Sequence, residues 1–254
     1  AEQEEPPVRP YEKNIAKYVM MPGNAKKRHP LVEVCPRLLK EYAETSPLNR
    51  VEMGGTQLGI ITSSTCYQYV TEVFGDSVSI LKIGMANPLP DQLILDFAKK
   101  VDRLVVMAGH MEDPNFREFN VIGDVKACQA IFQHWPTRIY VSPFELGVQI
   151  LYPARSIEND FRWAPNHPLV DSYKNYLPKM EDRPTWDLTA ALFAIQPRDF
   201  FTLSPAGYIT VTDEGHTLFT PRSEGTHFYL SATPDQARRI LEFFIQKTTE
   251  KVRN

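Results

Sequence analysis

Short apolar runs alternate with helix-like stretches along residues 57–143, and this alternation constrains the fold most strongly. The apolar runs are QLGIITS, VSILKIG, RLVVMAG and TRIYVSP, and between them lie TCYQYVTEVFG, PLPDQLILDFAKK and GDVKACQAIFQ. Strands that alternate with helices favour parallel pairing through right-handed crossovers. Near-continuous apolar strands such as LVVM suit a sheet that is covered on both faces. The pattern predicts an α/β protein with an open, mostly parallel, doubly wound sheet.

The remaining stretches extend this prediction to both ends of the chain. Residues 1–30 are rich in proline and polar residues, so we expect an extended arm there, followed by a helix near 36–45. Two further helices are expected near 168–177 and 185–195. GYITVTDEGHTLFT and THFYLSA predict a β-hairpin with a third strand, and TPDQARRILEFFIQKTTEKV predicts a closing amphipathic helix capped by Thr233. Asp124 is expected to cap the helix over GDVKACQAIFQ. The whole pattern is that of a Rossmann-like fold with a C-terminal hairpin and helix.

Composition limits the partners of the chain. Its 254 residues suffice for one large domain or two small ones, and a net charge of -3 lacks the basic excess that binding a nucleic acid demands. No apolar run is long enough to cross a membrane. The three cysteines, Cys35, Cys66 and Cys128, are widely spaced, which favours buried thiols in a reducing, cytoplasmic compartment. The acidic, proline-rich start does not resemble a signal peptide, although a leader removed earlier stays an alternative.

The first part of the chain resembles one known family. KYVMMPGNAKKRH, EYAETSPLNRVE, IITSSTCYQYV and VSILKIGMANPLPDQLILDFAKKVDRL are similar to the α subunit of indolepyruvate:ferredoxin oxidoreductase over about residues 10–107. The resemblance implies a structural α/β region between the parts that hold thiamine diphosphate. Residues typical of that cofactor, or of iron–sulfur clusters, are not found in this sequence, so neither group is expected.

The second part resembles a different family. LVVMAGHMEDPNFREFNVIGD, WPTRIYVSPFELG, LYPARSIENDF, PNHPLVDSY, DRPTWDLTAALFAI and FFTLSPAGYITVTDEG look like the C-terminal part of the inosine/uridine-preferring nucleoside hydrolases, over about residues 103–254. The resemblance implies hydrolysis of the N-glycosidic bond of a ribonucleoside, with a bound calcium ion. A small ribonucleoside is therefore the expected partner, and the oligomeric state stays open.

The resemblance assigns three site residues. Glu118 and Asn120, in EFN, match ribose-contacting positions and are expected on one side of an extended loop after a strand. Asp187, in TWDLTA, matches a calcium ligand at the start of a helix. Trp186 stands where many members carry a histidine, which argues against a histidine acid for the leaving group. Taken alone, Asp187 also fits a residue that stabilises a helix dipole, and Glu118 and Asn120 fit ordinary loop residues.

The expected calcium site is incomplete in this sequence. Calcium takes about six to eight oxygen ligands, and the hydrolases supply several of them from an N-terminal DxDxxxDD motif that this chain lacks. Whether Glu112, Asp113 or Asp160 comes within reach of Asp187 therefore decides whether a metal can bind. No catalytic residue is assigned.

Two resemblances that meet within DRLVVM indicate a chimera, and design is favoured because the join lies inside a strand. The sequence predicts two parts, 1–107 and 108–254, or one merged α/β domain. The leading interpretation is a nucleoside hydrolase-like protein, weak or inactive. The alternatives are a designed fold without biochemical function and a fragment of an oxidoreductase subunit.

Overall fold

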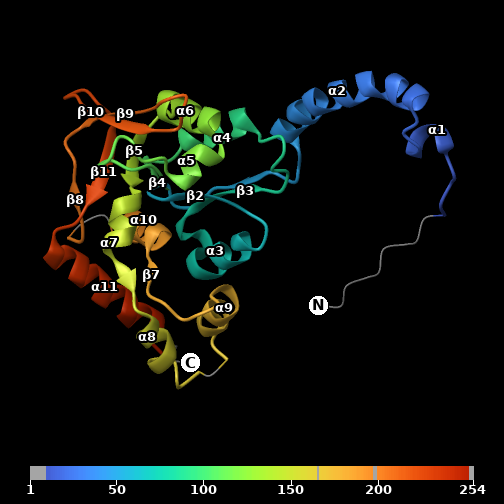
Figure 1. Ribbon diagram of the computed structural model, residues 1–254. Helices are drawn as coiled ribbons and strands as arrows, with labels where there is room; N and C mark the ends of the chain where they lie inside the picture. Colours follow the sequence, from blue (N-terminus) through green and yellow to red (C-terminus); the bar gives the residue numbers. More distant parts are fainter. Residues whose placement is uncertain (1–9, 165, 197–198, 252–254) are drawn as a thin grey trace.

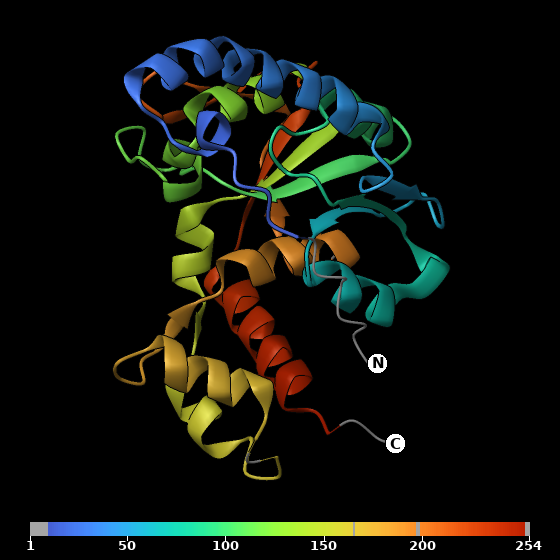
Figure 2. The same ribbon diagram turned by 90° about the vertical axis from the view of Figure 1, so that its right-hand side faces the viewer.

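The strands of the computed structural model form two larger sheets and a short two-stranded pair (Figure 1). The structure describes residues 10–164, 166–196 and 199–251. Strands and helices follow each other along the chain almost as the apolar pattern predicts, so the α/β class is confirmed. The expected open sheet, however, is divided between residues 83 and 103, and the two sheets lie beside each other (Figure 2).

The smaller sheet belongs to the first part of the chain. Its strands are β1 (Arg50–Glu52), β2 (Gly59–Ser63) and β3 (Ser79–Ile83). Strand β3 is central; β2 runs parallel to it and β1 antiparallel. The connections contain α3 (Cys66–Phe74), a 3₁₀ turn (Gly75–Ser77) and α4 (Asp91–Ala98). Side chains from β3, α4 and the turn after it form its core: Leu81, Ile83, Phe97 and Val101.

The larger sheet contains strands of the second part together with β4 (Arg103–Met107), which lies where the two resemblances meet. Its strands, in spatial order, are β10 (Thr217–Pro221), β9 (Gly207–Val211), β11 (His227–Ser231), β5 (Arg138–Ser142) and β4, with β8 (Thr202–Leu203) paired to β11. Strands β4, β5 and β11 are parallel, and β9 and β10 form the predicted hairpin. A separate pair joins β6 (Leu151–Tyr152) to β7 (Arg183–Pro184).

Helices cover both faces of the larger sheet, as a doubly wound fold requires. The helices from residue 119 onward are α5 (Phe119–Gly123), α6 (Val125–His134), α7 (Phe144–Gln149), α8 (Ala154–Asn159), α9 (Pro168–Tyr176), α10 (Trp186–Ile195) and α11 (Pro234–Thr249), of which α8 and α9 lie away from the sheet (Figure 2). Asp124 and Thr233 cap α6 and α11, as predicted. Side chains alternate along β5: Ile139 and Val141 belong to the core that includes residues of α5 and α6, whereas Tyr140 belongs to the other core.

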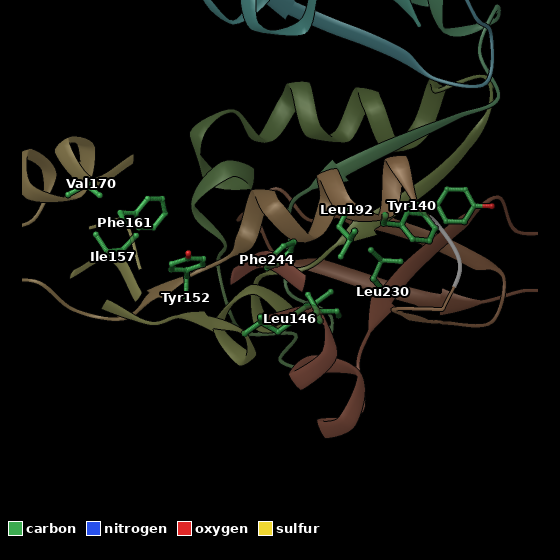
Figure 3. Packing of buried hydrophobic residues seen from close by; sticks show 12 residues of the cluster. Tyr140, Leu146, Tyr152, Ile157, Phe161, Val170, Leu192, Leu230 and Phe244 are labelled. Atoms are coloured by element: carbon green, nitrogen blue, oxygen red, sulfur yellow. The ribbon is translucent and has the colours of Figure 1, made fainter. Parts of the chain in front are cut away.

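The larger core fills the space between the sheet and α10 and α11. Figure 3 shows Tyr140, Leu192, Leu230 and Phe244 converging there. The same cluster continues past Tyr152 into α8 and α9. Apolar burial of this kind contributes roughly 25 cal/mol for each square ångström removed from water. The second part therefore has a hydrophobic core of its own, distinct from that of the smaller sheet.

The start of the chain differs from the sequence prediction. The expected arm over residues 1–30 is wrong for α1 (Ile15–Tyr18) and for α2 (Pro22–Thr45), which projects away from the sheets (Figure 1). Residues 1–9 of that arm lie outside the described residues. A proline in the first turn costs a helix nothing, and Ala25, Lys26 and Lys27 are good helix formers. The apolar pattern of the sequence did not predict this helix, because only Ala43 of α2 is buried and two prolines lie inside it.

Within the described residues, no helix combines the length and the apolar character that crossing a membrane requires.

Candidate functional site at the carboxyl ends of β4 and β5

Glu118 lies directly before α5 and is only 2% exposed. Its carboxylate accepts hydrogen bonds from the backbone N–H of Asn120 (3.0 Å) and Val121 (3.2 Å), the second and third residues of α5. It also accepts one from the N–H of Gly109, at 3.1 Å, in the turn after β4. Glu118 therefore ties the turn after β4 to the start of α5, and all three of these hydrogen bonds go to backbone.

Asn120 is exposed in the first turn of α5. The prediction of an extended loop that presents Glu118 and Asn120 on one side is wrong here, because the Glu118 cap starts a helix. Residues two apart on a helix diverge by about 200°. The Asn120 amide reaches back to the end of β4 and donates to Sδ of Met107 at 3.0 Å.

Asp187 is the second residue of α10 and is exposed. The cap position belongs to Thr185, whose hydroxyl donates to the carbonyl of Ile150 (2.8 Å) instead of capping the helix. An acidic side chain in the first turn stabilises the helix dipole, so this simpler role for Asp187 fits its position. Two residues later, the buried Thr189 bonds Ser142 at the end of β5, with 2.7 Å between the hydroxyl oxygens.

These contacts bring the three predicted residues to one edge of the larger sheet. Met107 and Ser142 are register partners at the carboxyl ends of β4 and β5. Asn120 touches the first of them, and the helix of Asp187 is fixed to the second. Ligands of open α/β sheets bind outside the carboxyl ends of the strands.

Trp186 is held by the helix that follows β5. Its indole N–H donates to the carbonyl of Phe144 at 3.1 Å, and the two rings stack with centroids 5.4 Å apart. A side chain on Gly147 would collide with Trp186, so the close packing of α7 against α10 requires glycine there. An indole engaged in this way offers no acidic proton to a leaving group.

The residues present do not fit a calcium ion. Across the described ranges, no three His, Cys, Asp or Glu side chains gather as metal ligands. Asp113 accepts a hydrogen bond from the N–H of Asn115, and Asp160 one from the hydroxyl of Ser156. Without such a group of side chains, Asp187 alone cannot supply the several oxygen ligands that calcium takes. The calcium expected from the resemblance therefore has no site built for it among these residues.

A buried acid and imidazole at the same edge escaped the sequence prediction. Glu145, in α7, places Oε2 3.5 Å from Nδ1 of His110, and both side chains are largely buried. Burial raises the pKa of Glu145, while hydrogen bonds from backbone N–H groups, including that of Met111, and the His110 ring act in the opposite direction. Glu145 Oε2 has no hydrogen-bond partner among the described residues.

The surroundings of this pair are aromatic. Phe116 and Phe144 pack on the His110 ring, with centroids 4.6 and 5.9 Å away, and Phe144 connects the group to Trp186. The pair therefore combines a buried carboxyl of raised pKa with a neighbouring imidazole among aromatic rings. The two residues are 35 positions apart, but each follows closely after a predicted strand. Because neighbouring parallel strands end at the same edge of a sheet, this shared position could have predicted that they lie close together.

The cysteines differ from their predicted burial. Cys35 and Cys66 are exposed, and Cys128 is partly buried, where burial raises the pKa of its thiol. No cysteine pair is formed among the described residues. Cys35 and Cys66 are therefore not core residues, since they are exposed on α2 and α3.

Comparison with known proteins supports a two-part resemblance. No protein-family model matches the chain. The indolepyruvate oxidoreductase subunit IorA of Pyrococcus horikoshii is 33% identical over 103 residues, and that of Methanothermobacter marburgensis is 35% identical over 103 residues. Each match covers 38% of this chain and 16% of the relative. The chain thus spans only a small part of the length of these relatives.

The solved structures that are similar to the chain include nucleoside hydrolases. A purine-preferring ribonucleoside hydrolase from Gardnerella vaginalis matches with a TM-score of 0.48 and 12% identity, covering 86% of this chain and 66% of the other. An inosine–uridine preferring nucleoside hydrolase from Bacillus anthracis matches with a TM-score of 0.47 and 14% identity, covering 84% and 65%. TM-scores this low do not establish a function.

Proposed function

We propose that the chain is a nucleoside hydrolase-like protein that binds ribonucleosides at the carboxyl ends of β4 and β5 and hydrolyses them weakly or not at all. The observation that carries the proposal is the convergence of Asn120 and the start of α10 on the paired residues Met107 and Ser142. The sequence resemblance supplies the substrate class. A ribose needs hydrogen-bond partners at such an edge, and these residues offer them.

Two exposed side chains would contact the sugar. The Asp187 carboxylate accepts hydrogen bonds from ribose hydroxyls, and the Asn120 amide both donates and accepts. Glu118 acts indirectly in this arrangement. Its carboxylate is bound to three backbone N–H groups, so it positions Asn120 and does not reach the sugar itself.

Hydrolysis requires more than this edge offers. Breaking an N-glycosidic bond needs an acid for the departing base and a base for the attacking water. Trp186 donates its only N–H to a carbonyl, and the raised pKa of the nearby Glu145 disfavours the ionised carboxylate that could take a proton from water. Because the residues do not fit calcium either, we assign no water-activating group, and we expect binding without efficient turnover.

A designed fold without biochemical function is the second candidate. The full engagement of Glu118 with backbone and the lack of any acidic cluster in the described ranges favour it. The third candidate, a fragment of an oxidoreductase subunit, accounts for the first part of the chain but offers no substrate site in the second part.

The test is titration of the protein with inosine and uridine by calorimetry, together with an assay for released ribose. We expect saturable binding and ribose release near background. Asp187→Ala should weaken binding by at least about tenfold, because a charged hydrogen bond contributes roughly 1.5–3 kcal/mol.

Asp171→Ala is the matched control, since Asp171 is an exposed aspartate in the first turn of α9. It should leave binding unchanged. Undetectable binding in the wild-type protein would overturn the proposal in favour of a fold without function, and equal losses in both variants would remove Asp187 from the site.

A further inference from the structure

We propose that the crevice between β2 and β4 binds a small apolar carboxylate, with its alkyl part between the two sheets and its charged group at Arg103. This site is independent of the proposed ribonucleoside site. It lies along the amino-terminal halves of the strands, whereas Met107 and Ser142 mark their carboxyl ends.

The crevice exists because the two sheets do not join. Strand β2 pairs only with β3, and β4 pairs only with β5, so within the described residues each has one strand edge without a partner. Consecutive residues of both strands line the space, from Gly59 to Ile61 and from Arg103 to Val105. A cavity on one face of a sheet would be lined by alternate residues, so this cavity runs along the strand edges.

The size and lining of the cavity suit a small apolar molecule. Its volume is about 350 Å³, within the range of roughly 300–1,000 Å³ that small-molecule sites occupy. Phe74, Phe97 and Trp135 contribute aromatic surface, and Ala191 and Ala194 of α10 leave room on the far side. An alkyl chain placed there loses contact with water, which favours binding.

The charge of Arg103 indicates which class of ligand fits the cavity. Among the residues that the structure describes, Arg103 is the only charged side chain that lines the cavity. Its guanidinium lies 5.9 Å from the centroid of the Tyr140 ring, and no carboxylate pairs with it among the described residues. A guanidinium binds a carboxylate through two parallel hydrogen bonds, so an apolar acid matches both parts of the site.

The experiment follows the intrinsic tryptophan fluorescence of the full chain during titration with octanoate and octanol. Of its three tryptophans, Trp135 lines the cavity and is expected to give the change on binding. We expect saturable binding of both, with octanol about tenfold weaker because it lacks the charge. Along a series from hexanoate to decanoate, affinity should rise roughly fourfold for each methylene until the cavity is filled. Absence of saturable octanoate binding, or equal affinity for octanoate and octanol, would overturn the proposal.

Two variants separate the charged and apolar parts of the site. Arg103→Gln should abolish the preference for octanoate, and Ala194→Leu should weaken both ligands about tenfold by filling the cavity. Arg138→Gln, at the register partner of Arg103, and Ala127→Leu, at an exposed alanine of α6, are the controls. Circular dichroism checks that each variant folds. A preference for octanoate that survives in Arg103→Gln, or losses shared by the controls, would contradict the assignment.

Discussion

The side chain whose behaviour depends most on its surroundings is Glu145. A carboxyl group buried among aromatic rings binds its proton more tightly than the same group in the unfolded chain, so burial raises its pKa above 4.5. Stability from this group is fully present below pH 4.5 and is lost as the pH rises through the raised pKa, because ionisation then leaves a poorly paired charge inside the fold.

We therefore predict that Glu145→Gln alters the pH dependence of unfolding. Glutamine keeps an oxygen for the N–H of Met111, which Glu145 binds at 2.8 Å, but cannot ionise. Relative to the variant, the wild-type protein should lose stability as the pH rises above 4.5. Urea unfolding at a series of pH values measures this difference, and Glu158→Gln, at an exposed position on α8, should follow the wild type. Parallel curves for wild type and Glu145→Gln would contradict the prediction.

Individual residues also mark the limit of what the sequence predicts. The resemblance placed Asp187 at the start of a helix, as the structure has it, whereas the extended loop expected for Glu118 and Asn120 is the start of α5. It did not predict that Glu118 would be engaged by backbone N–H groups, because glutamate is not among the usual helix caps. The pair of His110 and Glu145 depends on tertiary packing between segments that are far apart in sequence.

Among the elements, the closing helix α11 shows local sequence determining local structure. Thr233 and Gln236 form a capping box in which the Thr233 hydroxyl accepts from the N–H of Gln236 and the Gln236 amide oxygen accepts from the N–H of Thr233. Both residues were within the predicted segment, and short-range hydrogen bonds of this kind do not depend on the rest of the fold.

Thr233→Ala should lower the free energy of unfolding by about 1 kcal/mol, because the N–H of Gln236 loses the hydroxyl that accepts its hydrogen bond. Thr249→Ala, at the other end of the same helix, is the control. The Thr249 hydroxyl only donates to the carbonyl of Ile245, which is already a helical acceptor, so its removal should cost less. Thermal unfolding of the two variants provides the comparison, and equal losses would show that the capping box has no special role.

Elements whose formation depends on distant partners were predicted less well. Pro30 and Pro36 lie inside α2, where proline ordinarily breaks a helix, so the pattern gave an arm and a short helix in place of one long helix. The strands themselves were found from their apolar runs. Which strand edges pair is decided by packing between segments, and the division between β2 and β4 was not predictable from periodicity.

In the molecule as a whole, the two parts have separate hydrophobic cores. The core of the smaller sheet consists of residues between 51 and 101, whereas the two clusters of the larger sheet consist of residues from 104 onward. This separation agrees with the position where the two sequence resemblances meet. It favours two units of stability, although the cavity along β2 and β4 is lined by both parts.

Substitution of a buried residue in one core should therefore destabilise the part that contains this core and leave the other part stable. Phe97 and Phe193 are each 1% exposed, in the smaller and the larger core, and replacing a buried phenylalanine with alanine costs about 3–5 kcal/mol. We predict that Phe97→Ala accelerates amide hydrogen exchange in β2 and β3 and leaves β5 and β11 protected, with the reverse for Phe193→Ala. Mass spectrometry of exchanged peptides measures both. Faster exchange throughout the molecule in either variant would show one merged cooperative domain.

The central claim is that the carboxyl ends of β4 and β5 form a ribonucleoside site that lacks a metal site. Calcium titration by calorimetry tests this claim most directly. The wild-type protein and Asp187→Ala would be titrated with calcium, and ribose release from inosine would be assayed with and without the ion. We predict no calcium binding in the micromolar range and ribose release near background in both proteins, with or without calcium. Micromolar binding that disappears in Asp187→Ala, accompanied by calcium-dependent release of ribose, would contradict the claim and establish a working hydrolase centre.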